Sequence, residues 1–248
     1  MPNLATHIDL ARRTARRLEH PDLDANLGCF LLGSTSPDIR VITRQGRETY
    51  HFASLDFESV GAGMSGLFRA NPHLAPGAVE DARTRAFMAG YITHLIADEI
   101  WIVDMFRPYF GSAGVFGDKV VGMVMDRVAQ LELDRRAWPA VDGDLPKVGE
   151  GVDEVELGFI PPETLVEWRE WVVSLLTAGF SWDRLRFMAR RVAGGNGDHP
   201  AHGIADEFLR SVPEGMDRLY EVVPEDRLAG FVRQAVDVQS QAVGDYLR

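Results

Sequence analysis

The chain has 248 residues, of which 46% are hydrophobic and 25% charged, and its formal net charge is −11. This composition is typical of a globular protein that can bury a sizeable core. The negative charge argues against nucleic acid as a partner, because phosphate backbones are held by clustered lysine and arginine. It also disfavours binding to an anionic bilayer through charge alone. A metal site that handles one phosphate ester is not excluded.

Cysteine usage and hydropathy indicate the compartment. Cys29 is the only cysteine, which rules out an internal disulfide and cysteine-rich zinc motifs. Residues 1–20 lack a continuous apolar region, and their basic residues come too late for a signal peptide. No stretch reaches the roughly 20 apolar residues that a membrane span needs. We therefore expect a cytoplasmic protein without stable membrane insertion.

Helical periodicity dominates the chain and strand signals are scarce, which predicts an all-α bundle. Gly33 is expected to end the second helix, and Pro108 with Gly111 to end the long central one. The predicted helices span 5–20, 22–33, 56–70, 78–107, 116–136, 162–178, 181–193, 202–220 and 224–247.

One segment stands out as a connection between two helical parts. Residues 138–162 are rich in glycine, proline and acidic residues, which is typical of a linker or a long crossover loop. This divides the chain into a helical core at 1–137 and a helical extension at 163–248. The extension can be a separate domain or part of the same one.

Five histidine and aspartate residues of the first half have strongly apolar neighbours. Two of them lie four residues apart in "GYITHLIADEIW" (90–101), so their side chains project from one side of a helix, one turn apart. The others lie on the first helix, in the loop "GSTSPD", and in "TYHF". The five residues are His7, Asp38, His51, His94 and Asp98.

Each of these residues has an ordinary explanation when taken singly. A histidine near an apolar face is often a core residue with one hydrogen bond, an aspartate after Ser-Pro is often a turn or cap residue, and an i,i+4 pair gives a modest side-chain interaction. Burying all five without partners would cost several kcal/mol, whereas a divalent cation compensates them together. Imidazole plus carboxylate suits zinc, with iron or manganese as alternatives.

The motifs that carry these residues resemble the zinc-dependent phospholipase C family, whose fold is similar to that of the S1/P1-type nucleases. They are "THIDLA" (6–11), "LGSTSPD" (32–38), "HF" (51–52) and "GYITHLIADEIW" (90–101). In that family an early histidine, a Pro-Asp, a His-Phe and a His-x-x-x-Asp converge on a cluster of zinc ions. The resemblance implies a helical bundle of the phospholipase C/P1 nuclease type.

The resemblance also implies individual roles. Asp38, His51, His94 and Asp98 would bind one metal ion, and Asp98 would bridge to a second ion that His7 also holds. A bridging carboxylate is physically reasonable, because two nearby cations repel and need an anion between them. Asp38 would in addition be the catalytic residue that orients or deprotonates the attacking water.

The sequence departs from the family pattern at the third zinc. Relatives place a histidine six residues after the aspartate of His-x-x-x-Asp, followed by a His-x-x-x-Glu; here these positions hold Asp104, then Asp118 and Gly122. Asp104 and Asp118 remain candidate ligands, but Gly122 offers none. We expect two zinc ions and an altered or absent third site.

These inferences predict a metal-dependent hydrolase of phosphate esters, acting on a small-molecule or lipid phosphoester. Metal-activated water would be the nucleophile, since a bound metal lowers the pKa of water towards ~7. Two alternatives stay open. One is a metal-dependent enzyme of other chemistry, such as a lyase, a cyclase or an iron-dependent oxidation. The other is a non-catalytic, metal-stabilised helical protein.

Overall fold

The computed structural model describes residues 1–111, 113–152 and 154–248. Within these residues it contains helices and no strand, which confirms the predicted all-α fold. The helices are α1 Leu4–Leu18, α2 Pro21–Ala25, α3 Leu27–Gly33, η1 Ser36–Ile39, α4 Arg40–Thr43, α5 Arg47–His51, α6 Ala62–Ala70, η2 Pro72–Leu74, α7 Ala82–Ile100, η3 Trp101–Phe110, α8 Ala113–Phe116, α9 Lys119–Val148, α10 Pro162–Thr177, α11 Arg184–Val192, α12 Pro200–Arg210, α13 Val212–Val222 and α14 Glu225–Leu247.

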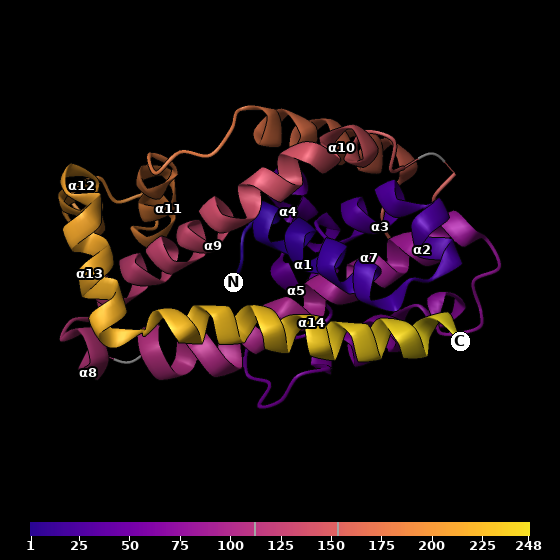
Figure 1. The fold of residues 1–248 in the computed structure, drawn as a ribbon, viewed down its shortest axis with the longest axis horizontal. Helices are drawn as coiled ribbons and strands as arrows, with labels where there is room; N and C mark the ends of the chain where they lie inside the picture. Colours follow the sequence, from indigo (N-terminus) through magenta and orange to yellow (C-terminus); the bar gives the residue numbers. More distant parts are fainter. Residues whose placement is uncertain (112, 153) are drawn as a thin grey trace.

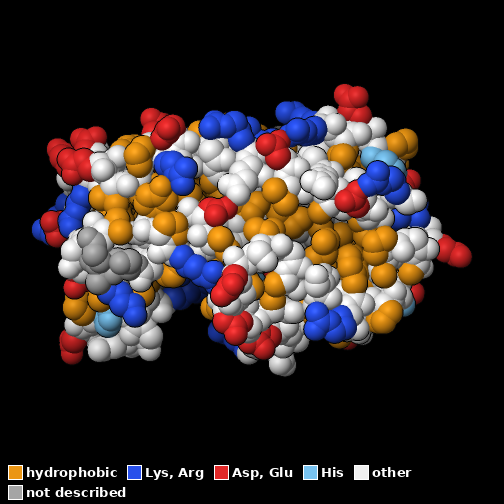
Figure 2. Space-filling view, turned by 90° about the horizontal axis from the view of Figure 1, so that it is seen from below, with side chains coloured by type: hydrophobic (Ala, Val, Ile, Leu, Met, Phe, Trp, Pro, Cys, Tyr) orange, Lys and Arg blue, Asp and Glu red, His pale blue; other side chains and the backbone are white. Residues whose placement is uncertain are grey.

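Helix α7 is the centre of the bundle. Helices α1, α3 and α14 pack against it, and α9 crosses the molecule in contact with α1, α10 and α11. Helices α12 and α13 lie at one end, from which α14 returns along α7 and α1 to the opposite end (Figure 1). On the face seen from below, hydrophobic side chains gather in the middle, and acidic and basic side chains are mixed around them (Figure 2).

Helix α7 is apolar around most of its circumference, as expected of a helix buried on all sides. It begins where the Asp81 carboxylate accepts a hydrogen bond from the Thr84 amide, 2.6 Å away. The expectation that no segment is apolar enough to span a membrane was wrong, because one helical segment is long and apolar enough by length and composition. An 18-residue window within Ala82–Phe110 reaches a mean hydropathy of 1.3, but 94% of this window is buried inside the fold. Its apolar character therefore matches its position in the core.

The central helix also continues past its predicted end at residue 107. Residues Trp101–Phe110 form π-helical turns that contain Pro108, and the Gly111 amide donates to the Phe106 carbonyl at 2.6 Å. Proline has no N–H to give to a regular i→i−4 ladder, and wider turns accommodate it without ending the helix. Pro108 therefore changes the pitch of this helix and does not end it.

Helix α9 is longer than predicted and takes in the first part of the expected linker. It runs through Pro139 and Pro146 to Val148, because buried residues continue at helical spacing after position 136. They are Ala137, Val141, Asp144 and Val148, and Asp144 forms an ion pair with Arg12 of α1. The connection to α10 therefore begins only at residue 149. The division into core and extension stays a prediction.

Short helices account for the other differences from the predicted boundaries. The predicted helices 22–33 and 202–220 are each divided, at Asn26 and at Ser211. The region between Gly33 and residue 56 folds into η1, α4 and α5, which are too short to produce a periodic hydrophobic pattern. His51, which lies outside the predicted helices, is the last residue of α5.

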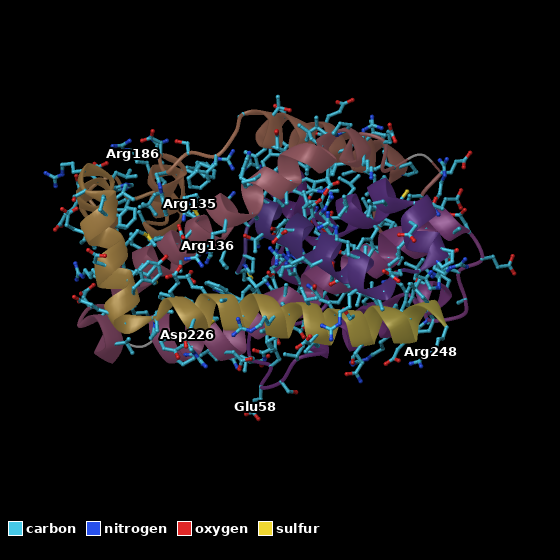
Figure 3. The ribbon with its side chains drawn as sticks, in the orientation of Figure 1. Glu58, Arg135, Arg136, Arg186, Asp226 and Arg248 are labelled. Carbon is cyan, nitrogen blue, oxygen red and sulfur yellow. The ribbon has the colours of Figure 1, made fainter. Side chains whose placement is uncertain are left out.

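An ion-pair cluster connects α9 to the start of α14. The buried Glu132 of α9 accepts hydrogen bonds from Arg135 and Arg136, and Arg136 continues to Glu225 at the start of α14. Figure 3 shows Arg136 in the space between α9 and α14. Charge-assisted contacts of this kind orient α14 where the chain turns back.

Two glycines bring α3 and α7 together. A Cβ on Gly33 would overlap the Phe87 carbonyl, and one on Gly90 would overlap the Phe30 carbonyl. The backbones approach closely only because neither position has a side chain. One helical turn beyond Gly90, His94 reaches the Ser34 carbonyl at the end of α3.

We expect Gly90→Ala to reduce stability by at least about 1–3 kcal/mol, the usual cost of overpacking a core. The added methyl would press on backbone that cannot move aside as a flexible side chain can. Urea denaturation followed by circular dichroism measures the effect. Gly203→Ala is the matched control, because nothing lies within 4 Å of a Cβ at that helical glycine. Equal stability of the two variants would contradict the close-packing explanation.

Candidate metal centre

The structure brings the five predicted residues of the first half together inside the bundle. His7 comes from α1, Asp38 from η1, His51 from α5, and His94 and Asp98 from α7. Two overlapping groups have potential ligand atoms within 4.8 Å of one another. The first contains His7, His94 and Asp98, and the second contains Asp38, His51 and His94.

Asp98 is the common partner of the three histidines. Its Oδ2 lies 3.1 Å from His51 Nε2 and 3.7 Å from His94 Nε2, and its Oδ1 lies 3.4 Å from His7 Nε2. The two oxygens thus face different imidazoles. This arrangement suits a carboxylate that bridges two cations, the role that the resemblance implies for Asp98.

Backbone carbonyls orient two of the imidazole rings. His94 Nδ1 lies 2.9 Å from the Ser34 carbonyl, and His51 Nδ1 lies 3.3 Å from the Arg47 carbonyl. A ring that donates its Nδ1 proton to a carbonyl presents a lone pair at Nε2, as metal-binding histidines do. The guanidinium of Arg47 also donates to Asp98 Oδ2 at 3.3 Å.

His7 carries the strongest indication that the cluster fits a cation. Its ring stacks on that of His94, with centroids 3.8 Å apart and planes 11° from parallel, and the residue is only 1% exposed. Within the described part of the chain, neither of its ring nitrogens has a hydrogen-bond partner, and neither has Asp98 Oδ1. Buried polar atoms without partners are costly, and coordination to a metal ion would satisfy them. These residues therefore fit zinc.

The protonation states follow from burial and from the shared carboxylate. Burial and the nearby His94 lower the pKa of His7 to about 4, and burial also lowers the pKa of His51. Burial opposes ionisation of Asp98, but His94 first, and then the nearby rings of His51 and His7, outweigh it and hold its pKa well below the usual range. Asp98 is thus ionised, and His7 and His51 are neutral, which are the states that metal binding requires.

His94 differs from the other two histidines. Burial favours its neutral form, but the Asp98 carboxylate outweighs burial and raises the pKa of His94. A cation bound at Nε2 would compete with this proton, since metal binding releases protons from its ligands.

The structure does not bring Asp104 and Asp118 into this cluster. Asp104 accepts a hydrogen bond from Gln234 of α14 at 2.7 Å. Asp118 is the N-cap of α9 and accepts from the amides of Val120 and Val121 at 2.7 and 3.0 Å. Neither belongs to a group of potential metal ligands among the described residues. Asp104 therefore links η3 to α14 and Asp118 caps α9, and their role as metal ligands stays a prediction.

Three residues around the cluster could not be recognised from the sequence. Arg47 and Ser34 hold Asp98 and His94, and Glu99 accepts hydrogen bonds from the Gly61 and Gly63 amides. The only signal in the sequence is the four-residue spacing from Arg47 to His51, which becomes meaningful once α5 is known to be a helix. The contacts of Ser34 and Glu99 depend on tertiary packing.

Asp134 of α9 fixes the start of the helix that carries His7. Its Oδ1 accepts from the Thr6 amide at 3.1 Å and from the Thr6 hydroxyl at 2.7 Å. The side chain of the N-cap residue Asn3 makes no capping bond, so Asp134 satisfies an N–H that α1 cannot satisfy itself. Burial nevertheless raises the pKa of Asp134 from 3.8 to about 6.

This shift predicts a pH-dependent stability. The pKa of Asp134 is higher in the folded state than in the unfolded state. Protonated Asp134 therefore stabilises the fold fully below pH ~4, and this stabilisation is lost as the pH rises through about 6. We expect the free energy of unfolding of the wild type to fall relative to Asp134→Asn, by up to about 3 kcal/mol between pH 4 and pH 7. Urea denaturation across this range tests it, with the exposed Asp217→Asn as control. Parallel pH profiles of wild type and Asp134→Asn would refute the assignment.

A cavity of about 520 Å³ adjoins the cluster at Asp38. Its walls come from the first residues of the chain and from η1, α4, α9, α10 and α11. This size lies within the usual range for small-molecule sites. Asp38 is half-buried and belongs both to the cavity lining and to the second ligand group.

Fold and site together define an all-α protein with a buried histidine–aspartate centre suited to a divalent metal. Residues 6–101 match the model of the zinc-dependent phospholipase C family, so the family prediction is confirmed over this segment. The matched segment contains all five converging residues and covers less than half of the chain. Comparison with curated proteins and with solved structures returned no match.

Proposed function

We propose that this protein is a zinc-dependent hydrolase of lipid phosphoesters. The family match supports a metal-dependent enzyme acting on phosphoric esters. The observation that carries the proposal is the position of Asp38, which belongs to the cavity wall and also lies with His51 and His94 in one ligand group. A substrate in the cavity would therefore meet the metal centre at this carboxylate.

Bound zinc would supply an acidified water as nucleophile and positive charge for the phosphoryl oxygens. The chain's own residues would do the rest. Asp38 would orient the attacking water and accept its proton, because its carboxylate reaches both the cluster and the cavity. The Ser34 carbonyl keeps the Nε2 atom of His94 directed at the centre, and Arg47 holds the carboxylate of Asp98.

Turnover of a panel of phosphodiesters and phosphomonoesters by the zinc-loaded protein tests this function. We expect hydrolysis of at least one lipid phosphodiester, and a loss of about 100-fold or more in Asp38→Asn, as removal of a general base typically causes. The exposed Asp217→Asn of α13 is the control and should retain full activity. Zinc content is measured for each variant, so that lost chemistry is distinguished from lost metal.

No turnover of any panel member by fully loaded protein would overturn the proposal. Iron in place of zinc in protein purified without added metal would favour the oxidative alternative. Zinc that has no exchangeable water would favour a structural role for the metal.

A further inference from the structure

The cavity beside Asp38 has a composition unlike that of the chain as a whole. Four arginines line it, Arg40, Arg127, Arg184 and Arg191, against the two carboxylates Asp38 and Asp134. The whole chain has 37 acidic and 26 basic residues. A cationic excess gathered at one cavity of an acidic protein indicates a negatively charged ligand.

Two of the four arginines are available to such a ligand. Arg127 bonds to Gln130 and lies 3.5 Å from Asp126, and Arg184 donates to the carbonyls of Leu175 and Gly179. By contrast, the side chains of Arg40 and Arg191 make no hydrogen bond and no ion pair within the part of the chain that the structure describes. The guanidinium of Arg191 lies over the Phe187 ring, 4.9 Å from its centroid.

The arginines are close enough to affect one another. The pKa of Arg191 is lowered first by burial, and Arg40, Arg127 and Arg44 lower it further, while Asp38 opposes them. Like charges that line one cavity repel, and an anion between them would relieve the repulsion through charge-assisted hydrogen bonds.

An apolar part of the cavity wall comes from α10 and from α11, the helix that also carries Arg184 and Arg191. It contains Trp171, Leu175, Phe187 and Met188, and Trp171 stacks on the buried Trp168 with centroids 5.0 Å apart. Phe187 is 57% exposed, so its ring is accessible from solvent. Such a wall would accept a hydrocarbon chain and exclude water from it.

We infer that this cavity selects anionic lipid phosphoesters over those with a quaternary ammonium headgroup. The hydrocarbon part would lie on Trp171, Phe187 and Met188, and Arg40 and Arg191 would bind the anionic headgroup region beside Asp38. A choline group would meet like charge from the arginines, which acts against zwitterionic lipids. This inference rests on the proposed function for the position of the scissile phosphate. The residues that would make the selection lie mostly outside the segment matched by the family model.

Isothermal titration of the zinc-loaded chain of 248 residues tests the selection without turnover. The probes are non-hydrolysable phosphonate analogues of dihexanoyl phosphatidylglycerol and dihexanoyl phosphatidylcholine, which share their chains and differ in the headgroup. We expect the phosphatidylglycerol analogue to bind about tenfold or more tightly than the other, the size of one charge-assisted hydrogen bond. It should also shift the tryptophan emission to the blue, and Trp171→Phe should remove most of that shift.

The variants Arg191→Gln and Arg40→Gln should each weaken binding of the anionic analogue about tenfold. Neither should weaken binding of the choline analogue, because each removes a charge that repels its headgroup. The matched control is Arg190→Gln, an exposed neighbour on α11 that does not line the cavity. Equal binding of the two analogues, or equal losses in Arg190→Gln and Arg191→Gln, would overturn the inference.

The outcomes also separate this inference from the proposed function. Selective binding without hydrolysis of any phosphoester would support the anionic cavity and refute the hydrolase. Hydrolysis of lipids with no preference for the anionic headgroup would support the hydrolase and refute the anionic selection.

Discussion

Replacing Asp98 by asparagine is expected to abolish metal binding and hydrolysis. Asp98 faces three imidazoles and the Arg47 guanidinium, and its charge is the only one within 3.7 Å of all three histidines among the described contacts. Asparagine has nearly the same shape but removes this charge, so the repulsion between bound cations would be uncompensated. Loss of an outer-sphere partner costs ~10–100-fold in metal affinity, and loss of this central carboxylate should exceed that.

Zinc titration with a competing chelator, together with turnover at saturating zinc, measures both effects. Circular dichroism at each zinc concentration shows whether the fold persists. The exposed Asp217→Asn of α13 makes the same chemical change away from the cluster and should bind zinc as the wild type does. If Asp98→Asn retained wild-type zinc affinity, the central role of this carboxylate would be wrong.

Zinc is also expected to raise the melting temperature strongly. The apo cluster buries unpartnered atoms of His7 and Asp98, and an ion that satisfies them binds the folded state alone. At free zinc about 1,000-fold above Kd the stabilisation is about 4 kcal/mol. For a chain of this length each kcal/mol raises Tm by about 2–4 °C, which gives a rise of about 8–16 °C.

Differential scanning calorimetry with and without zinc provides the measurement, and magnesium is the control cation. Magnesium prefers oxygen ligands in octahedral geometry, so a centre with three imidazoles should respond to it weakly. His94→Ala should lose most of the zinc-dependent rise, whatever its own melting temperature without metal. A rise that persists in His94→Ala would mean that zinc binds elsewhere.

The residue types of the centre were predictable because they follow local rules. His94 and Asp98 are brought together by the helical repeat alone, and the apolar residues around them indicated burial. The apolar neighbours of His7, Asp38 and His51 singled these residues out, and the family motifs predicted that they converge. Asp104 and Asp118 were candidates through the family offsets alone, and in the structure they contact α14 and cap the start of α9.

Helix boundaries were predictable where one face is buried over many residues. They were predicted too early where a proline was expected to end the helix. Pro108, Pro139 and Pro146 all lie inside helical segments. Proline removes one hydrogen bond and adds a clash, but buried neighbours on α9 and wider turns after Ile100 outweigh that cost. The balance depends on packing, which local propensity does not contain.

The sequence by itself determined the helical class, the acidic balance and the candidate imidazole and carboxylate ligands, because periodicity and side-chain chemistry are local properties. Only the tertiary structure decided that Ser34 and Arg47 orient those ligands and that α10 and α11 close a cavity of arginines and aromatics over Asp38. Those contacts join residues far apart along the chain. They depend on the close approach of α3 and α7 at Gly33 and Gly90, which no short stretch of sequence specifies.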